Sequence, residues 1–148
     1  MSSIQLRHKD IEPLLALFNI DVSKKDLLEL RDEKVVSINH ESAFFYYENK
    51  LVPTLHYLLK HPALLKKIVV DMGAVKFVVS GADIMRPGIV SIESEISTGD
   101  FLVIVDVNNK KPLAVGVSLF SSSEMQDMKT GKVVKNIHFV GDDVWKSV

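Results

Sequence analysis

The stretch DMGAVKFVVSGADIMRPGI, residues 71–89, concentrates small residues and positive charge in a single predicted loop. Its turn-forming residues are three glycines and one proline, Gly73, Gly81, Pro87 and Gly88. Glycine permits positive φ angles and a close approach of the backbone to a ligand, and proline restricts the backbone at the end of the loop. An anion held against exposed main-chain N–H groups would also meet the side chains of Lys76 and Arg86. The stretch therefore predicts a binding loop, and the alternative is that its glycines only turn a corner between two buried elements.

Composition is typical of an ordinary globular protein. The chain has 148 residues, 47% of them hydrophobic and 25% charged, which suffices for one sizeable core or two small ones. The absence of cysteine excludes disulfides, thiolate nucleophiles and cysteine-based zinc sites. No apolar run reaches the roughly 18 residues that a membrane span needs, and MSSIQLRHKD lacks the apolar centre of a signal peptide. We therefore expect a cytoplasmic protein.

The first part of the chain predicts one helix followed by three strands. Apolar residues between positions 11 and 18 recur at helical spacing, and Pro13 suits only a first turn, so the helix should begin near Glu12 and end at Asn19. The β-prone runs at 27–31, 34–39 and 42–48 predict a meander. Within the last run, the rings at 44–47 should alternate between two faces, with two of them in the core.

The segment LVPTLHYLLKHP, residues 51–62, predicts a short helix bracketed by prolines. Pro53 suits the first helical position and Pro62 lies just past the end. We expect the leucines of this helix to face a core: Leu55, Leu58 and Leu59. Residues 62–67 should join the two halves of the chain.

The second half alternates short strands with brief helices. β-branched and apolar runs predict strands at residues 66–71, 74–80, 89–96, 101–107, 112–120 and 133–140. The run SSSEMQDM, residues 121–128, is typical of a serine-capped helix, which Gly131 should terminate. Trp145 is expected to pin the end of the chain onto the strands of this half. The pattern indicates a small, mostly β barrel.

Two motifs in this half carry a family resemblance. VVDMGAVKFVVSGADIMRPGI, residues 69–89, and NIHFVGDDVW, residues 136–145, resemble the PUA domain, an RNA-binding module named for pseudouridine synthases and archaeosine transglycosylases. Together with LVPTLHYLLKHP, the ending IHF-x-x-D-x-x-W resembles the malignant T-cell-amplified-sequence family and its stand-alone archaeal relatives. The resemblance implies an α+β protein, with a small N-terminal α/β domain at 1–65 and a PUA-type β pseudo-barrel with short helices at 66–148. It also makes residues 73–80 a helix, where propensity alone predicts a strand.

The resemblance places an RNA-binding groove between this helix, the glycine loop after it and the last strand, at about residues 133–139. Carried over position by position, the expected RNA-binding residues are Lys76, Gly81, Ala82, Asp83, Ile84, Met85, Arg86, Pro87, Gly88, Lys135 and His138. The resemblance implies a non-catalytic protein of translation that binds structured ribosomal or transfer RNA. Its expected partners are the small ribosomal subunit and a protein like initiation factor one, with no membrane, DNA or cofactor. The alternative is an RNA-recognition accessory subunit of an RNA-modifying enzyme, of pseudouridine synthase or transglycosylase type.

Charge and site patterns bear on these alternatives. From residue 66 onward, ten Lys and Arg balance ten Asp and Glu, so RNA binding requires a local cluster of positive charge. Candidates are the group at 129, 132 and 135 and the hairpin lysines at 110 and 111, although paired lysines in turns often serve solubility. The sequence does not favour an enzyme. His56 and His61 lie five positions apart, whereas two histidines that bind one metal ion from a helix lie three or four positions apart. Glu93 and Glu95 have no nucleophile or metal ligands near them in sequence.

Overall fold

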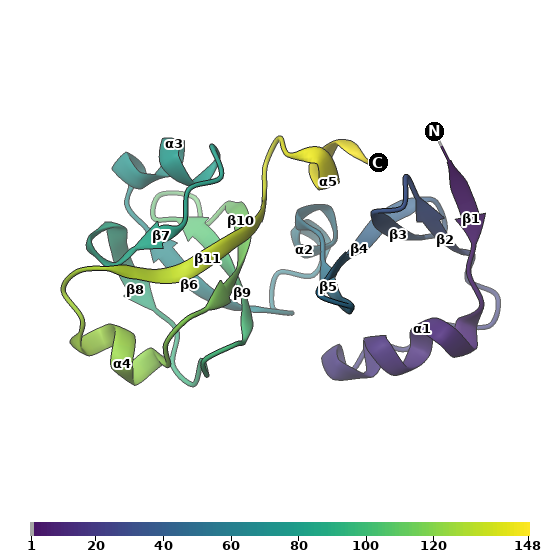
Figure 1. Cartoon of the computed structure of the whole chain (residues 1–148), viewed down its shortest axis with the longest axis horizontal. Coiled ribbons are helices and arrows are strands. Elements are labelled where there is room, and N and C mark those ends of the chain that lie inside the picture. Colours follow the sequence, from purple (N-terminus) through teal and green to yellow (C-terminus); the bar gives the residue numbers. More distant parts are fainter. Residues whose placement is uncertain (1) are drawn as a thin grey trace.

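The computed structural model describes residues 2–148 and contains two β-sheets joined by a short helix (Figure 1). The N-terminal sheet has five strands in the order β1-β2-β3-β4-β5, and the second sheet has six in the order β7-β11-β10-β9-β6-β8. Helix α2 lies between the two sheets, and α1 runs below the N-terminal sheet in this view. The chain is thus α+β, as the sequence predicts.

The N-terminal sheet is a meander in which every neighbouring pair is antiparallel. Its strands are β1 (Ser3–Gln5), β2 (Leu28–Arg31), β3 (Val35–Ile38), β4 (Glu41–Tyr47) and β5 (Lys50–Pro53). Its helices are α1 (His8–Leu15), the 3₁₀ turn η1 (Ala16–Phe18) and α2 (Leu55–Lys60). The three predicted strands are confirmed as β2, β3 and β4. The short edge strands β1 and β5 were not predicted, because three or four residues of mixed polarity carry no clear periodicity.

The second sheet curls into a nearly closed pseudo-barrel. Its strands are β6 (Lys66–Val70), β7 (Ile84–Met85), β8 (Ile89–Ile92), β9 (Phe101–Asp106), β10 (Pro112–Ser118) and β11 (Lys132–Phe139). Its helical segments are η2 (Met72–Ala74), α3 (Val75–Val78), η3 (Arg86–Gly88), α4 (Ser122–Asp127) and α5 (Asp143–Lys146). Strands β6 and β9 pair in parallel and the other neighbours are antiparallel, so the sheet is mixed. The expected pseudo-barrel with short helices is confirmed.

Residues 72–78 form a helical segment and residues 79–80 a turn, so the strand that propensity predicts at 74–80 is wrong and the helix that the resemblance implies is right. Asp71 starts the segment, because its Oδ1 accepts the N–H of Ala74 at 2.9 Å. The helix then buries Val78 while Lys76 and Phe77 stay exposed. One buried valine per turn is enough to hold so short a helix on the barrel, and this tertiary contact overrides β-propensity.

Four other local expectations need correction. Helix α1 begins at His8, so Pro13 lies inside it, on the exposed face. Pro53 ends strand β5, and the helix after it is capped by Thr54, whose hydroxyl accepts the N–H of Tyr57 at 3.2 Å. Leu59 is 52% exposed and does not face a core. Helix α4 carries the expected capping box of Ser121 and Glu124, but it ends at Asp127, before Gly131.

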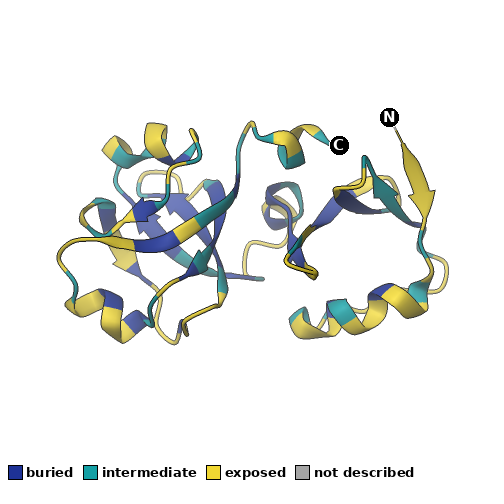
Figure 2. Cartoon of the chain, viewed as in Figure 1, coloured by how far each residue is buried: buried dark blue, intermediate teal, exposed yellow. Residues whose placement is uncertain are grey.

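Three apolar cores hold the molecule together (Figure 2). One fills the barrel, and another lies between α1 and the N-terminal sheet. The third joins the two sheets, because it combines Phe45 and Leu55 from one side with Val103 and Val115 from the other. Adjacent rings of β4 therefore serve different cores: Phe44 packs against α1 and Phe45 against the barrel. Fully burying one such side chain contributes about 1.5–3 kcal/mol.

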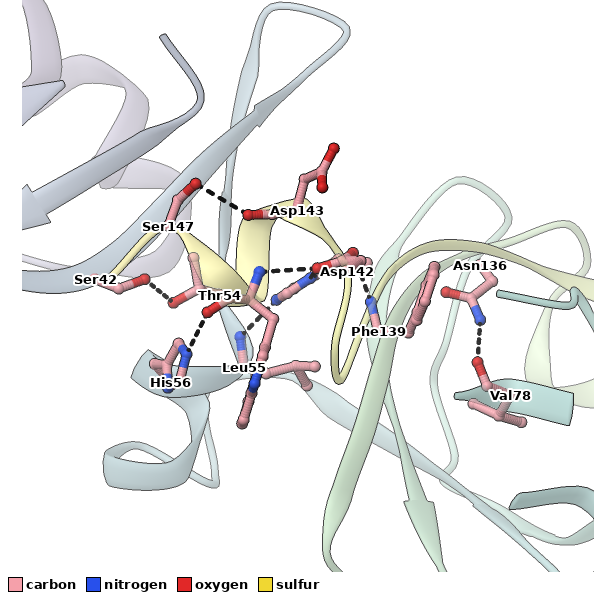
Figure 3. A network of polar contacts seen from close by, with 12 residues as sticks. Ser42, Thr54, Leu55, His56, Val78, Asn136, Phe139, Asp142, Asp143 and Ser147 are labelled. Atoms are coloured by element: carbon pink, nitrogen blue, oxygen red, sulfur yellow. Dashed lines mark hydrogen bonds and ion pairs between the residues drawn. The ribbon is translucent and has the colours of Figure 1, made fainter. Parts of the chain in front are cut away.

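A buried imidazole connects the sheets at the centre of this third core. His138 on β11 is fully buried, and its Nε2 accepts the main-chain N–H of Leu55, the first residue of α2, at 3.1 Å. Because Nε2 is an acceptor, Nδ1 carries the proton and donates to the carboxylate of Asp142 at 3.0 Å. Asp142 also accepts the N–H groups of Phe139 and Trp145 (Figure 3). The prediction that His138 meets phosphate or a base is therefore wrong, because its side chain is buried between the barrel and helix α2.

The C-terminal helix completes the same junction. Trp145 stacks on His56 of α2 with ring centroids 4.0 Å apart, and its main-chain oxygen lies 3.0 Å from Nε2 of His56. Trp145 packs on the core that the barrel strands share with α2, so it pins the chain end to both, and the sequence did not predict its contact with α2. The IHF-x-x-D-x-x-W motif thus serves the contact between the two sheets.

Asp142→Asn should lower the free energy of unfolding by about 1–3 kcal/mol at neutral pH, because a charged acceptor of three hydrogen bonds is lost. Burial alone would raise the pKa of Asp142, but the bonds from His138, Trp145 and Phe139 outweigh it and hold the pKa below its ordinary value of 3.8. A carboxylate with a depressed pKa stabilises the fold fully above about pH 5, and this contribution is lost as the pH falls through the folded-state pKa. Urea denaturation of both proteins between about pH 3 and 7 should show the difference shrinking at the acid end.

The matched control is Asp143→Asn, one residue away. The side chain of Asp143 is 83% exposed and lies 3.8 Å from Lys34, so its removal should change stability by less than about 0.5 kcal/mol. Equal losses for the two variants would show that the junction does not depend on Asp142.

Candidate nucleic-acid interface

A groove of about 460 Å³ opens on the barrel between the η2–α3 segment and the loop that follows it. Its lining is mostly apolar and comes from a continuous part of the chain, residues Val70, Asp71, Gly73, Ala74, Phe77, Val78, Ala82, Asp83, Ile84, Met85, Pro87 and Gly88. This is the glycine-rich stretch that the sequence singles out. Six of the expected residues line the groove, namely Ala82, Asp83, Ile84, Met85, Pro87 and Gly88.

The loop after α3 is fixed to strand β11 by polar contacts. The side-chain amide of Asn136 donates from Nδ2 to the main-chain oxygen of Val78 at 3.0 Å (Figure 3). The same Nδ2 donates to the main-chain oxygen of Ala82 at 3.0 Å, and the main-chain N–H of Asn136 donates to Oδ1 of Asp83 at 2.9 Å. Gly81 turns the chain between these points at φ +93°. The ring of Phe139 lies so close that a Cβ on Gly81 would approach it to 2.9 Å. The last strand therefore holds the loop in place, and Asn136 is a positioning residue that sequence reasoning missed.

The negative charge of Asp83 is balanced by a neighbouring ammonium group. Burial would raise its pKa, but the N–H of Asn136 and the ammonium of Lys132, at 3.0 Å, outweigh burial and keep the pKa below 3.8. Asp83 is therefore ionised and paired at neutral pH. Its negative charge does not stand alone at the rim of the groove.

Arg86 points away from the groove. Its Nε donates to the main-chain oxygen of Met125 in α4 at 2.7 Å, and its Nη1 lies 3.5 Å from the oxygen of Ile89. These contacts tie the loop to α4, and Arg86 does not line the groove. The arrangement favours a structural role for this guanidinium over a free phosphate clamp.

The remaining expected cations also lie outside the lining. Lys76 is exposed beside the groove, with its Nζ 5.1 Å from the centroid of the Phe77 ring. Lys135 is exposed on β11, and its Nζ lies 5.8 Å from the Tyr47 ring, whose side chain raises the pKa of Lys135 above 10.5. Gly81 shapes the turn without lining the groove. The positively charged side chains of Lys76, Arg86 and Lys135 thus lie outside the apolar lining of the groove.

The groove has an exposed apolar rim that sequence reasoning did not identify. Four large side chains near it are between 46% and 58% exposed: Met72, Phe77, Met85 and Val90. Phe77 is the most exposed of them and its ring borders the groove. The sequence contains one signal for this rim, which is a phenylalanine that follows a lysine. When this segment is helical, the side chains of Lys76 and Phe77 both face the solvent while Val78 is buried. A flat aromatic surface beside an ammonium group suits an unpaired base and its phosphate.

Two further observations concern metal binding and membrane spans. Within residues 2–148, no three histidine, aspartate or glutamate side chains lie close enough together to hold a metal ion. Among the helices that the structure describes, none is both long and apolar enough to cross a membrane.

Family comparison divides the chain into two matched regions. Residues 66–140 match the PUA domain, and residues 6–61 match a domain of unknown function, DUF1947. An uncharacterized protein of Methanocaldococcus jannaschii is 39% identical over 93% of this chain and 89% of its own length. Malignant T-cell-amplified sequence 2 of Mus musculus is 34% identical, over 91% of this chain and 77% of its own. Translation machinery-associated protein 20 of Schizosaccharomyces pombe is 29% identical, over 84% and 74% respectively.

Solved structures share the fold. A hypothetical protein of Pyrococcus horikoshii superposes with a TM-score of 0.85 at 28% identity, and the match covers 98% of both chains. A chain of the archaeal box H/ACA sRNP Nop10-Cbf5 complex matches with a TM-score of 0.53 at 26% identity, over 66% of this chain and 30% of its own. The first likeness covers both sheets, whereas the second covers only part of the chain.

Gly81→Ala should destabilise the protein more than Gly99→Ala. Both glycines have positive φ, +93° and +90°, and alanine in that region costs roughly 1–2 kcal/mol. At Gly81 the new Cβ would also collide with the ring of Phe139, which should add about 1 kcal/mol or more to the loss of stability, whereas nothing lies within 4 Å of a Cβ at Gly99. Thermal denaturation of both variants measures the difference, and equal melting temperatures would contradict the close packing of the loop on Phe139.

Arg86→Ala should lower stability by about 1–3 kcal/mol, because it leaves the oxygen of Met125 without its charged donor. The measurement is urea denaturation without RNA. Lys129→Ala, an exposed position in the same half of the chain, is the control and should be close to neutral. An unchanged Arg86→Ala midpoint would mean that the guanidinium is available for a ligand.

Proposed function

Because the chain belongs to the PUA-domain proteins of the malignant T-cell-amplified sequence family, we propose that it is a non-catalytic RNA-binding protein of the translation machinery. The PUA domain supports RNA binding, and the relatives named for the translation machinery support an association with translation. The ligand in this proposal is structured ribosomal or transfer RNA. We further propose that residues 1–65 and 66–148 are separate domains of a cytoplasmic protein.

The observation that carries the proposal is the apolar groove with its exposed aromatic rim. An unpaired nucleotide would place its base against Phe77 and the main chain of residues 81–88, and its phosphate near Lys76. Single-stranded ends and loops of RNA offer such bases, whereas the bases of a regular duplex are stacked out of reach. The groove therefore fits an exposed nucleotide within a folded RNA.

Electrostatics sets the expected mode of binding. Lys132 is paired with Asp83, and the residues from 66 onward carry no net charge. Few phosphates would be neutralised, so affinity should depend only weakly on salt. A partner that supplies further contacts would then be needed for tight binding. We propose the small ribosomal subunit and a protein like initiation factor one for this role.

The second candidate function is RNA recognition for an RNA-modifying enzyme. The likeness to a chain of the box H/ACA sRNP complex favours it, since that assembly contains a small RNA by its description. Affinity purification from cells at low salt separates the two functions. Recovery of small ribosomal subunits supports the first, and recovery of a pseudouridine synthase or transglycosylase supports the second.

Phe77→Ala should weaken binding of a transfer RNA by about 5- to 100-fold, because stacking of one base contributes about 1–3 kcal/mol. Lys76→Ala should weaken it less and reduce the slope of affinity against salt by about one. Fluorescence anisotropy at several salt concentrations measures both effects. Lys24→Ala, an exposed lysine in the N-terminal half, is the control. If Phe77→Ala binds like the natural protein, RNA does not use this groove.

A further inference from the structure

A second groove lies at the junction of the two sheets, and we call it the joint groove. It has a volume of about 400 Å³ and is lined by Leu58, Leu59, Pro62, Lys67, Val103, Val105, Asn109, Lys110, Lys111 and Pro112. Helix α2 and the connection after it form one wall, and β9 with the β9–β10 turn forms the other. It shares no lining residue with the groove proposed for RNA.

Three lysines give the joint groove a positive rim. Lys67 Nζ donates to the oxygen of Pro62 at 2.7 Å, and Lys110 Nζ lies 3.3 Å from the oxygen of Val107. Each ammonium retains donors for a further acceptor. Between residues 2 and 148, no carboxylate forms an ion pair with Lys67, Lys110 or Lys111.

The carboxylates near this rim are already occupied. Asp106 is only 4% exposed, and its two oxygens accept the N–H groups of Asn109 and Lys111 at 2.6 and 3.2 Å. Those main-chain bonds hold the pKa of Asp106 below its usual value, and they shape the turn that presents the lysines. Glu93 accepts the main-chain N–H of Lys67 and makes no ion pair with its ammonium. Three ammonium groups therefore stand near two carboxylates: Asp106 attracts Lys110 electrostatically, but none of the three lysines is held in an ion pair, and the rim keeps a net positive charge.

The floor of the joint groove is aliphatic. Leu59, which is 52% exposed, and the prolines Pro62 and Pro112 form its accessible surface, and the buried side chains of Leu58, Val103 and Val105 lie beneath them. No aromatic ring or arginine lines it, so it offers no plane on which a base could stack. An aliphatic floor with a rim of one charge sign matches an apolar side chain flanked by carboxylates.

We propose that the joint groove binds an acidic peptide segment of a partner protein, with a leucine- or phenylalanine-like side chain on the floor and aspartate or glutamate against the three lysines. Helix α2 and the second sheet both contribute to the groove, so the bound segment would contact the helix that joins the two halves as well as the barrel. The RNA groove remains free in this arrangement. The inference does not depend on what that groove binds.

Selection from a phage-displayed library of random peptides tests the proposal on the full chain. The enriched sequences should place Asp or Glu beside Leu, Ile or Phe. For a synthetic peptide of the enriched class, Lys110→Glu with Lys111→Glu should weaken binding by roughly tenfold or more, since two attractive charges become repulsive. Leu59→Ser should also weaken it, because the exposed leucine is part of the floor.

The control is Lys24→Glu with Lys25→Glu, which reverses an equally adjacent and exposed lysine pair away from the joint groove. It should change peptide affinity by less than about twofold. The proposal is overturned if no acidic class is enriched, or if the two double variants bind the peptide equally. It is also overturned if Phe77→Ala abolishes peptide binding or if single-stranded RNA displaces the peptide.

Discussion

The hydrogen bond between the Leu55 N–H and the buried imidazole of His138 is the contact on which the arrangement of the two sheets depends. It satisfies the first N–H of α2 inside an apolar core, where an unpaired donor would cost about 1–3 kcal/mol. Asp142 sets the tautomer that makes the bond possible, and it also caps the helix that carries Trp145. Orientation of the sheets, closure of the third core and docking of the C-terminal helix are therefore consequences of one polar cluster.

Strand β11 serves both halves of the molecule. Asn136 holds the loop of the RNA groove, and His138, two residues later, holds α2. Displacing this strand would disturb the groove and the junction together. The proposed ligand surface is consequently rigid, and its chemistry is apolar because the nearby charges are used in structure: Asp83 with Lys132, and Arg86 with the oxygen of Met125. Recognition of an exposed base fits such a surface better than a general attraction to phosphate does.

The two grooves differ in what their walls offer. The groove beside α3 has an exposed ring and main-chain groups, and the joint groove has an aliphatic floor under ammonium groups that are not held in ion pairs. They lie in different parts of the surface and use different residues. A protein that holds RNA in one and an acidic segment in the other could bring an RNA and a protein partner together.

The sequence by itself determined five of the six barrel strands and the capped helix at Ser121, because apolar runs and capping residues act over a few neighbouring residues. Six of the residues expected to bind RNA line the groove beside α3, and their role in binding stays a prediction. Only the tertiary structure decided that His138 is buried and that Arg86 donates to the main-chain oxygen of Met125. Each of these outcomes depends on a partner far away in the chain, such as Leu55 for His138 and Met125 for Arg86, and no local pattern records which distant group will satisfy a polar side chain.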